Sequence, residues 1–186
     1  MMNIIPQQAQ DSPLPTFGLP PDGLGQLAPL FQQGVRLRVA AGASVSDFLV
    51  DELGVDPEYV RSRITTVFLD GSVVDDMETA WLHQGSRLAL SAAMPGLVGA
   101  TLRKGGYYAA MRGAITLTEE QEVTPAAGQR VEVTVKLFNL LIEELGPQLL
   151  AHGIALSPTE ALSYLGPQAA VLPADASEVW LRVVPS

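Results

Sequence analysis

The sequence predicts an α+β protein, and three observations predict this class. Apolar residues make up 47% of the 186 residues and charged residues only 17%, a composition that supports a buried core. Stretches that alternate apolar and polar residues, typical of strands, occur in both halves of the chain. Stretches with apolar residues at helical spacing lie between them. We expect an extended arm over 1–33, a first domain over 34–97, a connector over 98–113 and a second small α+β domain over 114–186.

The arm is defined by its proline and glutamine content. Residues 1–33 hold six of the 14 prolines. Proline lacks a backbone donor and biases the residue before it toward extended geometry, so we expect neither a helix nor a central strand here. The arm is also apolar, with Leu14, Phe17, Leu19, Leu24, Leu27, Leu30 and Phe31. Two roles remain open for it, namely packing across its own domain or binding a partner.

The first domain begins with a strand followed by a helix. Val35, Leu37 and Val39 alternate with polar residues, which predicts a strand with one solvated face. Ser44 can cap a helix whose third residue, Asp47, completes an acidic form of the capping box. This helix carries an apolar stripe and is expected to end at the glycine Gly54.

A hairpin and a further strand complete the first domain. Residues 64–69 form an apolar stretch that ends at Asp70-Gly71, a pair typical of two-residue hairpin turns. Val73 and Val74 are expected to resume the partner strand, and residues 88–90 to form a fourth strand. One amphipathic helix must then cover one face of a mixed sheet.

Two stretches of this domain resemble a known family. The sequences TTVFLDGSVVDD (65–76) and QGSRLALSAAMPG (84–96) are similar to the ubiquitin-like β-grasp sulfur carriers, namely the thiamine-biosynthesis carrier and the small subunit of molybdopterin synthase. The resemblance covers residues 35–97 and implies a β-grasp fold there. Those proteins end in Gly-Gly, whose carboxylate is adenylated and becomes a thiocarboxylate. Here the chain continues past Gly96, so the resemblance implies no sulfur transfer unless the chain is first cleaved.

A second glycine pair could provide such a cleavage point. The stretch LRKGG (102–106) resembles the end of ubiquitin, and cleavage after Gly106 would expose a terminal carboxylate. The alternative interpretation is a flexible turn, because glycine pairs are common in loops for conformational reasons.

The connector lies in a basic island of an acidic protein. No aspartate or glutamate occurs between Thr79 and Thr118, although the net charge of the chain is −9. The guanidinium groups of arginine and the backbone N–H groups of a glycine-rich segment can bind an anion or an acidic partner surface. The candidate binding residues are Arg103, Lys104, Gly105, Gly106, Tyr107, Tyr108 and Arg112. The alternative is a connector whose charges complement the acidic flanks of the same molecule.

The C-terminal third repeats the mixture of strands and helices. Residues 114–118 and 131–137 are predicted strands, and apolar residues over 137–149 form a helical stripe that Gly146-Pro147 should kink or interrupt. Ser157 begins a short helix that ends near Gly166, and residues 179–184 form a last strand.

Several functional classes are excluded by what the sequence lacks. Without cysteine there are no disulfides, thiolate metal sites or cysteine nucleophiles, and His83 and His152 lie far apart in the sequence. No catalytic motif is present, so we expect no enzymatic activity, no metal and no cofactor. A pI near 4.6 argues against binding nucleic acid or an anionic membrane. With no apolar run of about 18 residues, we expect a cytoplasmic protein.

The function that the sequence favours is therefore a non-enzymatic protein-interaction or assembly module built on a carrier-like domain. Its partner is a protein of unknown identity, and a homo-oligomer is also possible. Two alternatives remain: a sulfur carrier or ubiquitin-like modifier activated by cleavage after Gly106, and a protein that binds a small anionic ligand through the connector.

Overall fold

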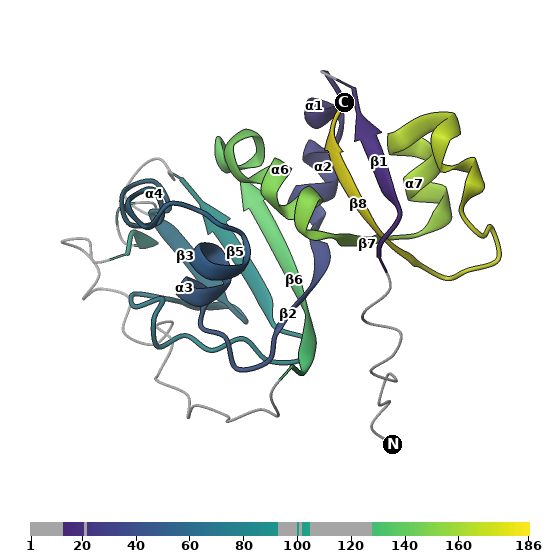
Figure 1. Cartoon of the computed structure of the whole chain (residues 1–186). Coiled ribbons are helices and arrows are strands. Elements are labelled where there is room, and N and C mark those ends of the chain that lie inside the picture. Colours follow the sequence, from purple (N-terminus) through teal and green to yellow (C-terminus); the bar gives the residue numbers. More distant parts are fainter. Residues whose placement is uncertain (1–12, 21, 93–99, 101, 105–127) are drawn as a thin grey trace.

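The computed structural model describes residues 13–20, 22–92, 100, 102–104 and 128–186, which contain eight strands and several helices (Figure 1). The strands are β1 (Thr16–Leu19), β2 (Val35–Ala40), β3 (Thr66–Leu69), β4 (Ser72–Val73), β5 (Arg87–Ser91), β6 (Arg130–Phe138), β7 (Ile154–Leu156) and β8 (Val179–Pro185). The helices are α1 (Gly23–Gln26), α2 (Ala28–Gln33), α3 (Val45–Asp47), the π-helix η2 (Phe48–Glu52), α4 (Pro57–Ser62), α6 (Leu141–His152), α7 (Pro158–Leu165) and the 3₁₀ helix η4 (Gly166–Val171).

The eight strands form one mixed sheet in the order β1-β8-β7-β2-β6-β5-β3-β4. The pairs β1/β8 and β5/β6 are parallel, and the other neighbours are antiparallel. A mixed sheet with helices packed on it confirms the expected α+β class at this level. None of the described helices combines the length and the apolar composition that a bilayer crossing requires.

The strand expected over 131–137 is β6, and it lies in the middle of the sheet. It pairs with β2 from Val35↔Val135 to Ala40↔Arg130, and with β5 from Arg87↔Thr134 to Ser91↔Phe138. Its alternate residues Val131, Val133, Val135 and Leu137 are buried. The stretches expected as a first domain and a second domain are therefore joined through a common sheet.

The prediction for the N-terminal arm is wrong for residues 23–33, which form α1 and α2 instead of extended chain. Pro29 lies in the first turn of α2, where its missing N–H has no helical acceptor in any case. Leu27, Leu30 and Phe31 are buried in the core, and β1 is an edge strand that pairs with β8. Packing across its own domain is thus the role that the structure confirms for this stretch.

The local signals of the first domain are confirmed. Ser44 and Asp47 form the expected capping box, and Asp70-Gly71 connects β3 to β4 with both residues at positive φ. Val45, Phe48 and Leu49 pack into the core beneath the sheet. The helix continues from α3 into η2, a single turn of π-helix.

The helical stripe over 137–149 is only partly correct. Leu137 and Phe138 belong to β6, which is followed by Asn139 at positive φ. Helix α6 then runs without interruption through Pro147, contrary to a break at Gly146-Pro147. Ser157 caps α7 with a full capping box, as expected.

Helix α6 packs closely on the N-terminal helices at Gly146. A Cβ atom at this position would lie 3.1 Å from two ring atoms of Phe31, which is fully buried, and 3.3 Å from Leu24. The glycine is therefore required by the close approach of α6 to α1 and α2.

We expect Gly146→Ala to lower the free energy of unfolding by about 1–3 kcal/mol, because the added methyl group overpacks the fully buried ring of Phe31. Gly25→Ala is the matched control, since a Cβ there meets nothing within 4 Å and should leave the stability unchanged or raise it by up to about 1 kcal/mol. Urea denaturation measures both. An equal or greater stability for Gly146→Ala contradicts the packing described.

A cluster of polar side chains connects α4 and Arg63, the residue after it, to α6. The Glu144 carboxylate accepts a hydrogen bond of 2.6 Å from the Tyr59 hydroxyl and one of 2.9 Å from Arg63 Nε. The hydrogen bonds from Arg63 and then Tyr59 lower the pKa of Glu144 from 4.5 to about 2, while burial and Glu144 raise the pKa of Tyr59.

This lowered pKa makes a pH-dependent contribution to stability. The contribution is fully present above the unfolded pKa of about 4.5 and is lost as the pH falls toward the folded pKa of about 2. We therefore expect Glu144→Gln to be less stable than the wild type at pH 6, with a difference that shrinks as the pH approaches 2.5. Thermal melts across this range measure it, with the exposed neighbour Glu143→Gln as control. A difference that is constant with pH would refute the assignment.

Candidate functional site

Two of the seven candidate residues from the connector are described, namely Arg103 and Lys104; Gly105, Gly106, Tyr107, Tyr108 and Arg112 lie outside the described residues. Arg103 is exposed, whereas Lys104 is partly buried. The backbone N–H of Lys104 donates to the carbonyl of Thr65 at 2.7 Å, and its Nζ donates to the carbonyl of Val60 at 3.3 Å. Lys104 is therefore held beside the start of β3.

The surroundings of Lys104 are acidic. It lines a cavity of about 430 Å³ together with Arg61 and five carboxylates, those of Asp47, Asp51, Asp75, Asp76 and Glu78. Burial lowers the pKa of the Lys104 ammonium. Five carboxylates disfavour an incoming anion, so these surroundings favour the interpretation in which the connector's charge complements acidic residues of the same molecule.

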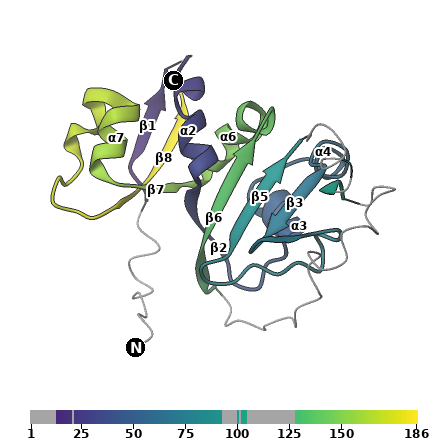
Figure 2. The same ribbon diagram turned by 180° about the vertical axis from the view of Figure 1, so that it is seen from behind.

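A second cavity lies on the opposite side of the sheet. In β3, β5 and β6, one set of alternate residues is buried against the layer that contains α3 and η2, and the other set lies on the far side. Figure 2 views the molecule from this far side, with β3, β5 and β6 in front of α3. We call this side of the three strands the open face.

The cavity on the open face has a volume of about 420 Å³ and a mostly apolar lining. Its walls include Phe68 of β3, Ala89 of β5 and Phe138 of β6, with Thr66, Leu90, Ser91 and Asn139 completing the lining. Phe68 lies directly across from Ala89 in the β3/β5 register. The cavity is thus built by strands from both halves of the chain.

The cavity lining contains one unpaired polar group. Thr66 is 1% exposed, and its hydroxyl is buried and has no hydrogen-bond partner among the described residues. Nearby, Asn139 Nδ2 donates to Ser91 Oγ at 2.9 Å. A buried hydroxyl without a partner costs about 1–3 kcal/mol.

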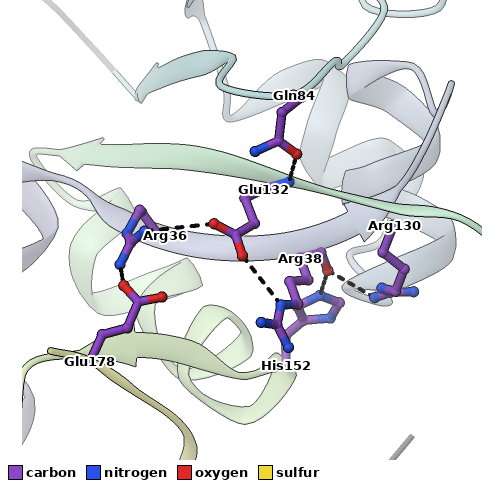
Figure 3. Close-up of polar contacts among 7 residues, drawn as sticks. All are labelled: Arg36, Arg38, Gln84, Arg130, Glu132, His152 and Glu178. Carbon is purple, nitrogen blue, oxygen red and sulfur yellow. Dashed lines mark hydrogen bonds and ion pairs between the residues drawn. The ribbon is translucent and has the colours of Figure 1, made fainter. Parts of the chain in front are cut away.

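A network of ion pairs crosses β2 and β6 toward the start of β6, away from Phe138 at its other end (Figure 3). The Glu132 carboxylate lies 3.6 Å from Arg36 and 3.5 Å from Arg38, and Arg36 also pairs with Glu178. The guanidinium of Arg38 lies 4.0 Å from the centre of the Trp180 ring. The charges of Arg36 and Arg38 are therefore compensated within the molecule.

Two further cations of the open face are not compensated in this way. Lys136 lies across from Ala89, and Arg87 lies across from Thr134, in the β5/β6 register. Neither side chain forms an ion pair with any residue in the described ranges. The stem of Lys136 packs on Gly34, where an added Cβ would lie 3.2 Å from its Cγ. Arg87 and Lys136 therefore add positive charge to the open face near the cavity, although neither residue belongs to the cavity lining.

The two histidines occupy structural positions. His152, at the end of α6, bonds to the Arg38 carbonyl at 3.0 Å, which also accepts from Arg130 at 2.8 Å. The Ala40 N–H donates to Glu52 at 2.7 Å. These side chains provide hydrogen-bond partners for backbone groups of β2 at positions where β2 does not pair with β7, because that pairing is limited to Arg36↔Ala155.

His83 is exposed and lies 3.2 Å from Asp70. No group of three histidine or carboxylate residues in the described part of the chain could hold a metal ion.

Sequence reasoning did not identify the residues of the open face. Phe138 was expected in a helix, and the strand positions of Phe68 and Ala89 carry no motif that distinguishes them from core residues. The period of two along β3, β5 and β6 is the signal that places them on one face, but only once the order of the strands is known.

In comparisons with protein-family models, curated proteins and solved structures, no family, protein or structure matches the chain. The function must therefore be argued from the site itself.

The acidic cavity gives a test of the role of Lys104. We expect Lys104→Glu to lower the free energy of unfolding by about 1–3 kcal/mol, because a sixth carboxylate joins five others in a partly buried cavity. The control Arg182→Glu changes an exposed cation on β8 and should stay within about 0.5 kcal/mol of the wild type. Urea denaturation compares the two. Equal effects would show that Lys104 has no compensating role.

Proposed function

We propose that this chain is a non-enzymatic protein-interaction module that binds its partner through the open face of β3, β5 and β6. The observation that carries the proposal is the apolar cavity lined by Phe68, Ala89 and Phe138, with the buried unpaired hydroxyl of Thr66 in its lining. Anchor side chains at protein interfaces fill apolar cavities of this kind, and a flanking polar group fixes their orientation.

The strand arrangement supports a carrier-like lobe within this module. The part β2-β6-β5-β3-β4 of the sheet is covered on one side by α3 and η2, and its inner pair β5/β6 is parallel. We propose that these five strands form a β-grasp-like lobe, to which β6 contributes an inner strand from outside residues 35–97.

The geometry gives less support to the two alternatives. A fragment ending at Gly106 would lack β6, which pairs with β2 and β5 inside the sheet, so a carrier produced by cleavage there would lose a central strand. A small anion at Lys104 would meet five carboxylates. A docking role requires neither a free carboxylate nor a net positive cavity.

The cavity can be blocked by a single substitution. We expect Ala89→Arg to fill it with a long cation and to reduce binding of a native protein partner by about tenfold or more. The measurement is native mass spectrometry of complexes formed by the tagged full-length chain in its source organism. Leu162→Arg, at a 49% exposed position on α7, is the control and should retain the partner.

Thermal melts must first show that each variant is folded. Should Ala89→Arg unfold the chain, Phe138→Ala, which widens the cavity and removes its aromatic wall, serves in its place. A partner retained unchanged by a folded cavity variant would refute the proposed docking face.

A further inference from the structure

The open face offers a partner an apolar contact within one small area. Phe68 and Phe138 stand on either side of β5, where the small side chain of Ala89 leaves room between them. The volume of about 420 Å³ is enough for one large aliphatic or aromatic side chain together with part of its backbone.

The charges beside the cavity define the second requirement. Arg36 and Arg38 are neutralised by Glu132 and Glu178, so they add little attraction for a partner. Arg87 and Lys136 remain unpaired within the described residues and flank Ala89, one along β5 and one across the β5/β6 register. Two positively charged residues therefore lie on the open face near the cavity, on a protein of net charge −9. Carboxylates placed over these two side chains would be attracted, whereas cations would be repelled.

The same charge pattern separates two classes of macromolecule. Nucleic acids bind through many phosphate contacts, which need an extended set of Lys and Arg residues. Two unpaired cations beside an apolar cavity, on a strongly acidic chain, do not provide that set. They do suit a few carboxylates that surround one apolar residue.

We infer that the partner contacts the open face with an acidic protein segment that inserts one large apolar side chain between Phe68 and Phe138 and places carboxylates over Arg87 and Lys136. This inference rests on the proposed function, because it names the chemistry of the partner at the proposed docking face. The cavity provides the anchor contact, and the two cations select the residues around it.

The inference can be tested without knowing the natural partner. The probe is a displayed library of random 12-residue peptides, selected on the full-length chain and counter-selected on Ala89→Arg. We expect enriched peptides that carry aspartate or glutamate around one Phe, Tyr, Trp, Leu, Ile or Met. The double variant Arg87→Glu/Lys136→Glu should weaken binding of these peptides by about tenfold or more, and raised salt should weaken wild-type binding. Arg182→Glu, a matched charge reversal on β8, should leave the affinity unchanged.

Each result has a defined meaning. Peptides that depend on Ala89 but bind the double variant equally well would overturn the inference while leaving the proposed docking face in place. The inference would also be overturned if the selection enriched basic peptides, or if none of the enriched peptides lost binding to Ala89→Arg. The proposed function is tested separately, by the co-purification experiment with the cavity variants. Polyuridylate RNA is tested in parallel, and binding of it that the double variant abolishes would assign the face to nucleic acid instead.

Discussion

The structure depends on the pairing of β6 with β2 on one side and with β5 on the other. The β2/β6 ladder joins six residue pairs and the β5/β6 ladder joins five, and the valines of β6 are buried in the core. Because α6 follows β6 almost directly, this pairing also sets where α6, β7 and β8 lie. Removing β6 would separate β2 from β5 and divide the sheet in two.

The same pairing creates the candidate site. Side chains alternate along a strand, so the register that buries Val135 and Leu137 places Lys136 and Phe138 on the other side, next to Ala89. A shift of one residue would exchange the two sets and remove both the cavity and its flanking charge. The core and the proposed docking face therefore depend on the same strand register, and mutations that disturb this register should affect both.

Sequence reasoning succeeded where a structure is decided within three or four residues. The capping boxes at Ser44 and Ser157 and the turn at Asp70-Gly71 depend on neighbours in the sequence, and all three are confirmed. The place of β6 could not be found in this way, because alternation identifies a strand without identifying its neighbours. The cavity and the acidic surroundings of Lys104 are likewise made by segments distant in the sequence. The proline content misled the assignment of α2, since Pro29 occupies a position in the first turn that tolerates it.

The late position of β6 along the chain also has a consequence for biosynthesis. On the ribosome, β2 and β5 are translated well before the strand that lies between them, so the nascent chain exposes two unpaired inner edges until β6 emerges. Unpaired edges of this kind can template association with other chains. The part β2-β6-β5-β3-β4 of the sheet is therefore completed only after β6 has been synthesised, and slow translation beyond β5 would lengthen the time for which these edges are exposed.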